Sequence, residues 1–151
     1  MRIAIILALL VPAYAYAADS SPAPRAPSDV YLQRYDAAKD RQDWAGAASV
    51  MKDAVAAKPD NADYHNLYAY SLRKSGTKQM DLVFQHYNEA LRLDPKHRGA
   101  HEYLGEAYLQ LGNLAKAKDE LAALDKLCLF GCSEYSELKN AISQYEARAA
   151  R

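Results

Sequence analysis

A repeat with a period close to 36 residues limits the folds open to this chain. Pro59 and Pro95 each follow a segment rich in alanine or leucine, and they lie 36 residues apart. Because proline cannot continue a helix, each one marks the end of a helix at the same point of a repeated unit. Aligning the chain on these prolines predicts three units, at about 28–61, 62–97 and 98–131.

The third unit has the clearest pattern. It reads His101-x2-Leu104-Gly105-x2-Tyr108, then Gly112, then Ala117-x3-Leu121-x2-Leu124. The apolar residues recur at helical spacing, and Gly112 separates two such runs, which predicts a helical hairpin with Gly112 in the turn. Gly105 is expected to let the two helices of that hairpin approach closely.

These spacings resemble those of the tetratricopeptide repeat (TPR), a 34-residue helical hairpin. The second unit matches through Tyr68, Ala69, Leu72, Gly76, Tyr87, Ala90 and Pro95, and the first through Trp44, Ala47, Met51, Ala54 and Pro59. Two departures stand out. Arg41-Gln42-Asp43 replaces the turn glycine of the first unit, and the second has about two extra residues around 77–82, close to Met80 and Phe84.

The resemblance implies an all-α TPR solenoid. The scarcity of β-branched residues after the first dozen agrees with this class, because sheets favour such residues. A last helix is expected at about 133–149, where Tyr135, Leu138, Ile142 and Tyr145 repeat at helical spacing and Ser133 is the expected cap. It would cover the apolar face of the third hairpin, as the end of a solenoid requires.

The first 17 residues have the pattern of a secretory signal peptide. A short basic start precedes an apolar run from Ile3 to Val11 and a small-residue cleavage sequence at 15–17. Nine apolar residues are too few to span a bilayer. Residues 18–29 carry three prolines and small polar residues and are expected to be a disordered linker, with a TPR domain at 30–151. The expected location is therefore periplasmic or otherwise secreted.

Balanced charge narrows the class of partner. Lys plus Arg (19) equals Asp plus Glu (19), which argues against a nucleic-acid binder, since such proteins neutralise phosphates with basic residues.

The TPR family binds proteins or peptides in a concave groove lined by the first helix of each repeat. In the first repeat, the positions that would face this groove are Asp29, Leu32, Asp36 and Lys39. The residues predicted to contact a partner are Asn66, Tyr70, Arg73, Lys74, Glu102, Tyr103, Glu106 and Gln110.

One known TPR subclass can be tested on residue types. TPR proteins that hold the carboxylate tails of heat-shock chaperones use lysine, asparagine and arginine at five groove positions. Here those positions hold Leu32, Asp36, Leu67, Gly99 and Tyr103. This carboxylate clamp is absent, so a chaperone-tail adaptor is not expected.

Cys128 and Cys132 are the two cysteines of the chain. An even count in an exported protein predicts a disulfide, and Gly131 would let the backbone turn between them. The Leu-Cys-x-Phe-Gly-Cys-x-Glu-Tyr ending also resembles that of short exported bacterial TPR proteins. A redox-active pair is the alternative, as is a metal site with His97 and His101, although His101 occupies a packing position of the repeat.

The sequence therefore predicts a non-enzymatic protein-interaction module with no catalytic residue, metal or cofactor. It carries none of the common catalytic or phosphate-binding motifs. Two alternatives remain open: a thiol-redox or metal-handling accessory protein that uses Cys128 and Cys132, and a self-associating structural protein. No membrane span is expected in the mature chain, and a homo-oligomer is an open possibility.

Overall fold

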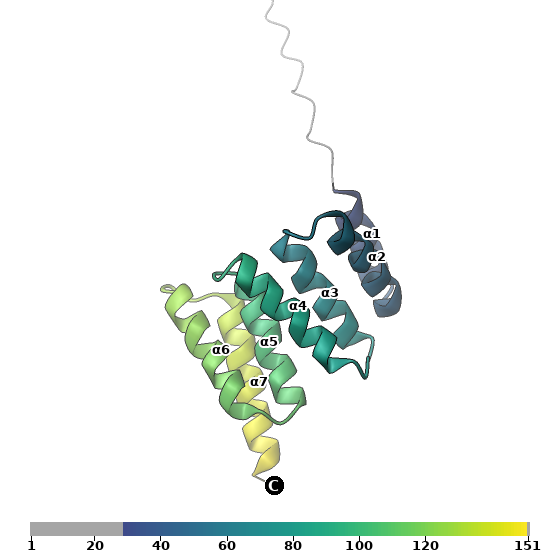
Figure 1. Cartoon of the computed structure of the whole chain (residues 1–151). Helices are drawn as coiled ribbons and strands as arrows, with labels where there is room; N and C mark the ends of the chain where they lie inside the picture. The colour runs from purple at the N-terminus through teal and green to yellow at the C-terminus, as the bar shows by residue number, and fades with distance from the viewer. Residues whose placement is uncertain (1–28, 151) are drawn as a thin grey trace, which may run out of the picture.

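The computed structural model describes residues 29–150, and within them every regular element is a helix (Figure 1). The predicted all-α fold of three hairpins and a final helix is confirmed. The expected signal peptide, and the linker up to residue 28, lie outside the described residues. The helices are α1 (Val30–Asp40), α2 (Trp44–Ala57), α3 (Ala62–Lys74), α4 (Met80–Leu93), α5 (Arg98–Gln110), α6 (Leu114–Leu127) and α7 (Ser133–Ala149).

The core consists of successive clusters, each shared by one hairpin and the helix that follows it. Buried side chains of α1 and α2 pack with Tyr64 and Tyr68 of α3. Residues of α3 and α4 pack with Leu104 of α5, and α6 packs with Leu138 and Ile142 of α7. A single hairpin leaves an apolar face that only its neighbour can bury, which explains why the array needs α7.

The hairpin turns share one backbone conformation. Gly76 and Gly112 have φ of +75°, and Gln42 takes the matching place in the first hairpin with φ of +56°. In each turn, this residue and the next one donate backbone hydrogen bonds to carbonyls of the last helical turn. Gln42 thus adopts a left-handed conformation that favours glycine, which costs about 1 kcal/mol.

Gly105 permits a close approach, but not the one expected. A Cβ atom at this position would lie 2.6 and 2.7 Å from the two methyl carbons of Leu138. Leu138 belongs to α7, so Gly105 brings α5 close to the capping helix rather than to α6. The expectation was wrong because glycine faces the first helix of the following unit in this packing.

The two extra residues of the second hairpin lengthen its turn. Helix α4 begins at Met80, four residues after Gly76, whereas α6 begins two residues after Gly112. Gln79 precedes α4 without a side-chain capping bond. Met80 and Phe84 lie on α4 and pack against the second core cluster.

Helix α7 begins one residue later than its expected cap. Cys132 has an extended backbone, and its Sγ accepts a hydrogen bond from the Tyr135 amide at 3.4 Å, while Ser133 is already helical. The predicted Ser133 cap was therefore wrong by one residue. Cys132 takes the capping place because its backbone is extended where the helix starts.

The array curves toward the first helices of its hairpins. Helices α3, α5 and α7 contact one another in sequence, whereas α2, α4 and α6 make no mutual contacts among the described residues. Close spacing on one side and wide spacing on the other define a concave face formed by α3, α5 and α7, and α1 adjoins it through the ring contact of Tyr31 with Tyr64 of α3 (Figure 1). No helix in residues 29–150 combines the length and apolar character needed to cross a membrane.

Candidate functional site

Three aromatic side chains form a continuous row on the concave side, which we call the aromatic ladder: Trp44, Tyr70 and Tyr103. The ring centroids of Trp44 and Tyr70 are 5.4 Å apart, and those of Tyr70 and Tyr103 are 4.5 Å apart. The three residues come from different hairpins, so the ladder crosses all three repeats. Half-exposed aromatic rings of this kind offer contact area with little side-chain entropy to lose.

The groove positions that the TPR resemblance implies included Tyr70 and Tyr103, but they missed Trp44. Trp44 is the first residue of α2, a helix of the outer layer, and it reaches the concave side because it sits at the turn between α1 and α2. Only the stacking of the hairpins brings this end of α2 beside Tyr70. A large aromatic residue directly after a turn was the available sequence signal.

Arg73 links two repeats rather than projecting freely. Its guanidinium donates to a Glu106 carboxylate oxygen at 2.6 Å and to the Tyr87 hydroxyl at 3.4 Å, and its side chain is only 6% exposed. Burial opposes the charge, but Tyr87 and Glu106 outweigh it and hold the pKa of Arg73 above its usual value. Arg73 also lies over the rings of Tyr70 and Tyr103. Arg73 therefore helps to hold these two rings of the aromatic ladder in place.

Glu102 is buried against the capping helix. Its side chain is 3% exposed, and burial together with a hydrogen bond to Glu137 raises its pKa to about 8. The carboxyl is therefore mostly protonated at pH 7. Two of the predicted contact residues therefore present little negative charge to a partner, because burial favours the neutral form of the Glu102 carboxyl and Glu106 pairs with Arg73.

Asn66 is buried as well, with 5% of its surface exposed. Its amide nitrogen would lie 3.4 Å from a Cβ atom at position 99, so the side chain packs beside Gly99 of α5. Its Oδ1 atom has no hydrogen-bond partner. Asn66 and Glu102 lie buried beneath the surface of the concave face, so a partner would reach them only if nearby side chains moved. Their predicted contact with a partner stays a prediction.

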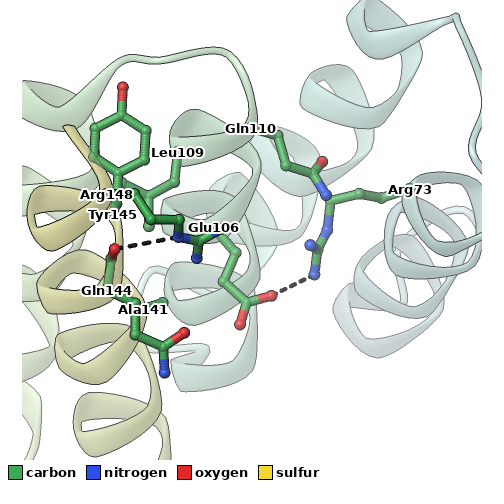
Figure 2. A pocket seen from close by; sticks show the side chains of 8 residues that line it. All are labelled: Arg73, Glu106, Leu109, Gln110, Ala141, Gln144, Tyr145 and Arg148. Carbon is green, nitrogen blue, oxygen red and sulfur yellow. Dashed lines mark hydrogen bonds and ion pairs between the residues drawn. The ribbon is translucent and has the colours of Figure 1, made fainter. Parts of the chain in front are cut away.

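A cavity of about 250 Å³ opens where α3, α5 and α7 meet. Figure 2 shows Arg73 and Glu106 facing one another on one side of it, and Arg148 on the side of α7. The guanidinium of Arg148 donates to the Gln144 carbonyl at 3.2 Å. The residues that line the cavity are Arg73, Glu106, Leu109, Gln110, Ala141, Gln144, Tyr145 and Arg148.

Half of this lining comes from α7, which the sequence reasoning treated only as a cap. Extending the repeat register by 36 residues from Leu109 reaches Tyr145, and both line the cavity. That register could have identified the contribution of α7. The capping helix is therefore also the last wall of the concave face.

Lys74 and Gln110 are the exposed members of the predicted set. The Lys74 ammonium lies 5.4 Å from the Trp44 ring centroid and 6.0 Å from that of Tyr70. The ladder thus presents a cation beside two rings, at the end of the concave face near the first turn. Gln110 lies at the end of α5, beside the cavity.

The first repeat contributes mainly structural contacts. Asp29 caps α1 by accepting bonds from the Tyr31 and Leu32 amides, and its carboxylate also accepts a hydrogen bond from Tyr64 of α3. Asp36 pairs with Lys39 at 2.8 Å on the same helix. Of the four further groove positions, Leu32 packs partly against the first core cluster.

The histidines hold the repeats together. His65 and His101 each bond the carbonyl of the preceding proline, Pro59 or Pro95, at 2.9 and 3.2 Å. The other ring nitrogen of each one reaches the second helix of the hairpin, at His86 and Glu120 respectively. This repeated arrangement agrees with the expected packing role.

Neither ring of the proposed His97–His101 pair is directed at a shared ligand. His97 caps α5 through Nδ1, and its Nε2 lies 3.1 Å from Asp63. Within residues 29–150, no three His, Cys, Asp or Glu side chains lie where they could together hold a metal ion.

The two cysteines are close enough to pair. Their Sγ atoms lie at disulfide distance, and their Cα atoms are 5.6 Å apart. Gly131 has φ of +84°, and its amide donates to the Cys128 carbonyl, which makes the tight turn expected between them. The disulfide itself stays a prediction.

The fold and the concave face define an all-helical solenoid of two-helix repeats with a row of aromatic side chains on its inner side. The family model of the tetratricopeptide repeat matches residues 78–142, and solved tetratricopeptide repeat domains share the fold of the described residues. The resemblance drawn from the repeat spacings is confirmed. No curated protein sequence matches the chain.

Solved TPR structures share the fold at low sequence identity. The TPR2B domain of yeast Sti1, in its pHsp70 complex, superposes with a TM-score of 0.68 at 18% identity, over 78% of this chain and 94% of that one. The type III secretion translocator chaperone SycD of Yersinia enterocolitica gives 0.66 at 17% identity, over 84% and 90%. PcrH, in complex with the chaperone binding region of PopD, gives 0.65 at 17%, over 80% and 90%.

Proposed function

We propose that this protein is exported and uses its concave face to bind an extended segment of another protein, without catalysing a reaction. The observation that carries the proposal is the aromatic ladder, because Trp44, Tyr70 and Tyr103 run across three repeats at ring spacings of 5.4 and 4.5 Å. Two of the similar structures, Sti1 and PcrH, are named with bound protein partners. Export rests on the signal-peptide pattern of residues 1–17.

The chemistry of the face favours a segment with apolar and acidic side chains. The rings supply apolar area, and the exposed Lys74 ammonium lies beside two of them. Arg73 and Glu106 neutralise each other, so neither presents an unpaired charge to a partner. An acidic side chain of the bound segment would pair with Lys74 while a neighbouring apolar side chain packs on the ladder.

Capture from a periplasmic extract tests the proposal. The binding-face variant combines Tyr70→Ala with Lys74→Glu, which removes the central ring and reverses the exposed cation. Arg73 is left intact because a carboxylate at that buried site would face Glu106 and endanger the fold. The matched control is Lys52→Glu, which makes the same charge change on the exposed surface of α2.

We expect wild type and the α2 control to retain the same protein and the binding-face variant to lose it. Circular dichroism of all three proteins checks that they fold equally. Equal capture by the binding-face variant would show that the concave assignment is wrong.

A further inference from the structure

The loop between α6 and α7 presents two apolar side chains to solvent. Phe130 is fully exposed, at 102%, and Leu129 is 81% exposed. They form the tip of a tight turn that Gly131 makes possible and that the two cysteines close at its base. We call residues 128–132 the cysteine loop. A rigid turn that holds a Phe and a Leu in water is suited to insertion into an apolar hollow, since little entropy remains to be lost.

An apolar hollow lies at the other end of α6. It has a volume of about 470 Å³, well above the roughly 150 Å³ that holds a benzene ring. Phe84 and Tyr108 stack at 4.9 Å in its wall, and Leu111, 58% exposed, stands at its edge. We call it the Phe84 hollow, lined by Phe84, Asn88, Tyr108, Leu111, Asn113 and Lys116.

The cysteine loop cannot enter the hollow of its own chain. Helix α6 has 14 residues and so is about 21 Å long. The loop follows its C-terminal end, whereas Asn113 and Lys116 of the hollow lie at its N-terminal end (Figure 1). Contact between these two surfaces therefore requires two molecules.

The polar surroundings of the two surfaces also match. The loop follows the C-terminal end of α6, where the last-turn carbonyls carry partial negative charge beside the exposed Lys126 side chain. The rim of the hollow carries the Lys116 ammonium, 5.1 Å from the Tyr108 ring centroid, and the side-chain amides of Asn88 and Asn113. The hydrogen-bond donors on the rim of the hollow would then face the carbonyl acceptors beside the cysteine loop. A protein interface usually has such a polar rim around an apolar centre.

We propose that the occupant of the Phe84 hollow is the cysteine loop of a second copy of this protein, with Phe130 inserted between Tyr108 and Leu111. The contact joins different surfaces of the two molecules, so it is head-to-tail and leaves one loop and one hollow free at the ends of each assembly. This contact lies outside the concave face. It also gives a role to Phe84, which lies near the lengthened turn of the second hairpin. Because one inserted loop is small for an interface, association should be weak.

Sedimentation velocity over a concentration series up to about 1 mM tests the contact. We expect the full mature chain to associate with rising concentration. Phe130→Ser and Leu111→Lys should each weaken association at least about tenfold, because they remove the inserted ring or charge the edge of the hollow. Val30→Ser, at another exposed apolar residue far from both surfaces, is the control and should associate as wild type does.

A mixing experiment separates head-to-tail contact from symmetric pairing. The Phe130→Ser protein keeps its hollow and the Leu111→Lys protein keeps its loop. An equimolar mixture should therefore form dimers that neither protein forms alone, and these dimers should not grow further. A wild type that stays monomeric, a variant that associates like wild type, or a mixture without dimers would each overturn the proposal.

Discussion

Replacement of Gly105 by alanine measures how tightly the capping helix closes the concave face. The new Cβ would lie 2.6 and 2.7 Å from the Leu138 methyl carbons, about 1 Å inside normal carbon contact. Leu138 is fully buried, so it has no room to move. Overpacking of this kind costs about 1–3 kcal/mol, and the gain in helix propensity returns about 1 kcal/mol. We expect a net loss on the order of 1 kcal/mol.

The effect of Gly105→Ala on stability should change from a loss to a gain when Leu138 is shortened. In a Leu138→Ala background the clash disappears, and Gly105→Ala should stabilise the protein by about 1 kcal/mol through helix propensity. The coupling free energy between the two substitutions is then about 2 kcal/mol. Urea unfolding of the four proteins, followed by circular dichroism, gives each value.

Gly99→Ala is the matched control in the same helix. Its Cβ would be 3.4 Å from the nearest atom, the Asn66 amide nitrogen, so little strain is expected. If Gly105→Ala stabilises as much as the control, or costs the same with and without Leu138, then α7 does not pack against α5 as described.

Four further outcomes follow from the described contacts. Gln42→Gly should raise the free energy of unfolding by about 0.5–1 kcal/mol, because it relieves a left-handed conformation; a loss in urea unfolding would refute this. Glu102→Gln should stabilise the protein at pH 8 by on the order of 2 kcal/mol, since the raised carboxyl pKa makes wild type lose stability as pH rises from about 4.5 to about 8. Glu120→Gln should cost about 1 kcal/mol at pH 5.5. Burial lowers the pKa of His101, but the hydrogen bond to Glu120 helps to raise it above its usual value. The stability that this bond contributes is therefore present below pH 6.5 and is lost as pH rises through the pKa of His101 in the folded protein. A loss of stability that does not depend on pH would contradict this reasoning. Reduction of the pair of Cys128 and Cys132 should lower stability by roughly 2 kcal/mol, and thiol counting in the denatured, unreduced protein should find no free thiol.

The repeat register could be predicted because its signals are local. Gly76 and Gly112 supply left-handed turns, and Pro59 and Pro95 end helices, so each hairpin is visible within its own segment. The first turn could be located only by alignment with the other units, because Gln42 has no intrinsic preference for the left-handed conformation that the surrounding hydrogen bonds impose.

The state of the concave residues could not be predicted in the same way. The groove positions implied by the TPR resemblance placed Tyr70, Arg73 and Glu106 on one face, but the Arg73–Glu106 bond depends on how far adjacent hairpins rotate against each other. Burial of Glu102 depends on α7, which the sequence reasoning treated only as a cap and which contacts Glu102 through Glu137. Spacing within one helix gives direction, whereas charge and exposure come from neighbouring helices.

Crosslinking inside the cell gives the most direct test of the concave face. A photoreactive phenylalanine analogue replaces Tyr103 on the ladder in one protein and Lys52 on α2 in a control. We predict that light joins the Tyr103 protein to a discrete periplasmic partner, that mass spectrometry maps the crosslink to an extended segment of it, and that the control gives no such product. Equal crosslinking from both positions, or from the control alone, would contradict a binding site on the concave face.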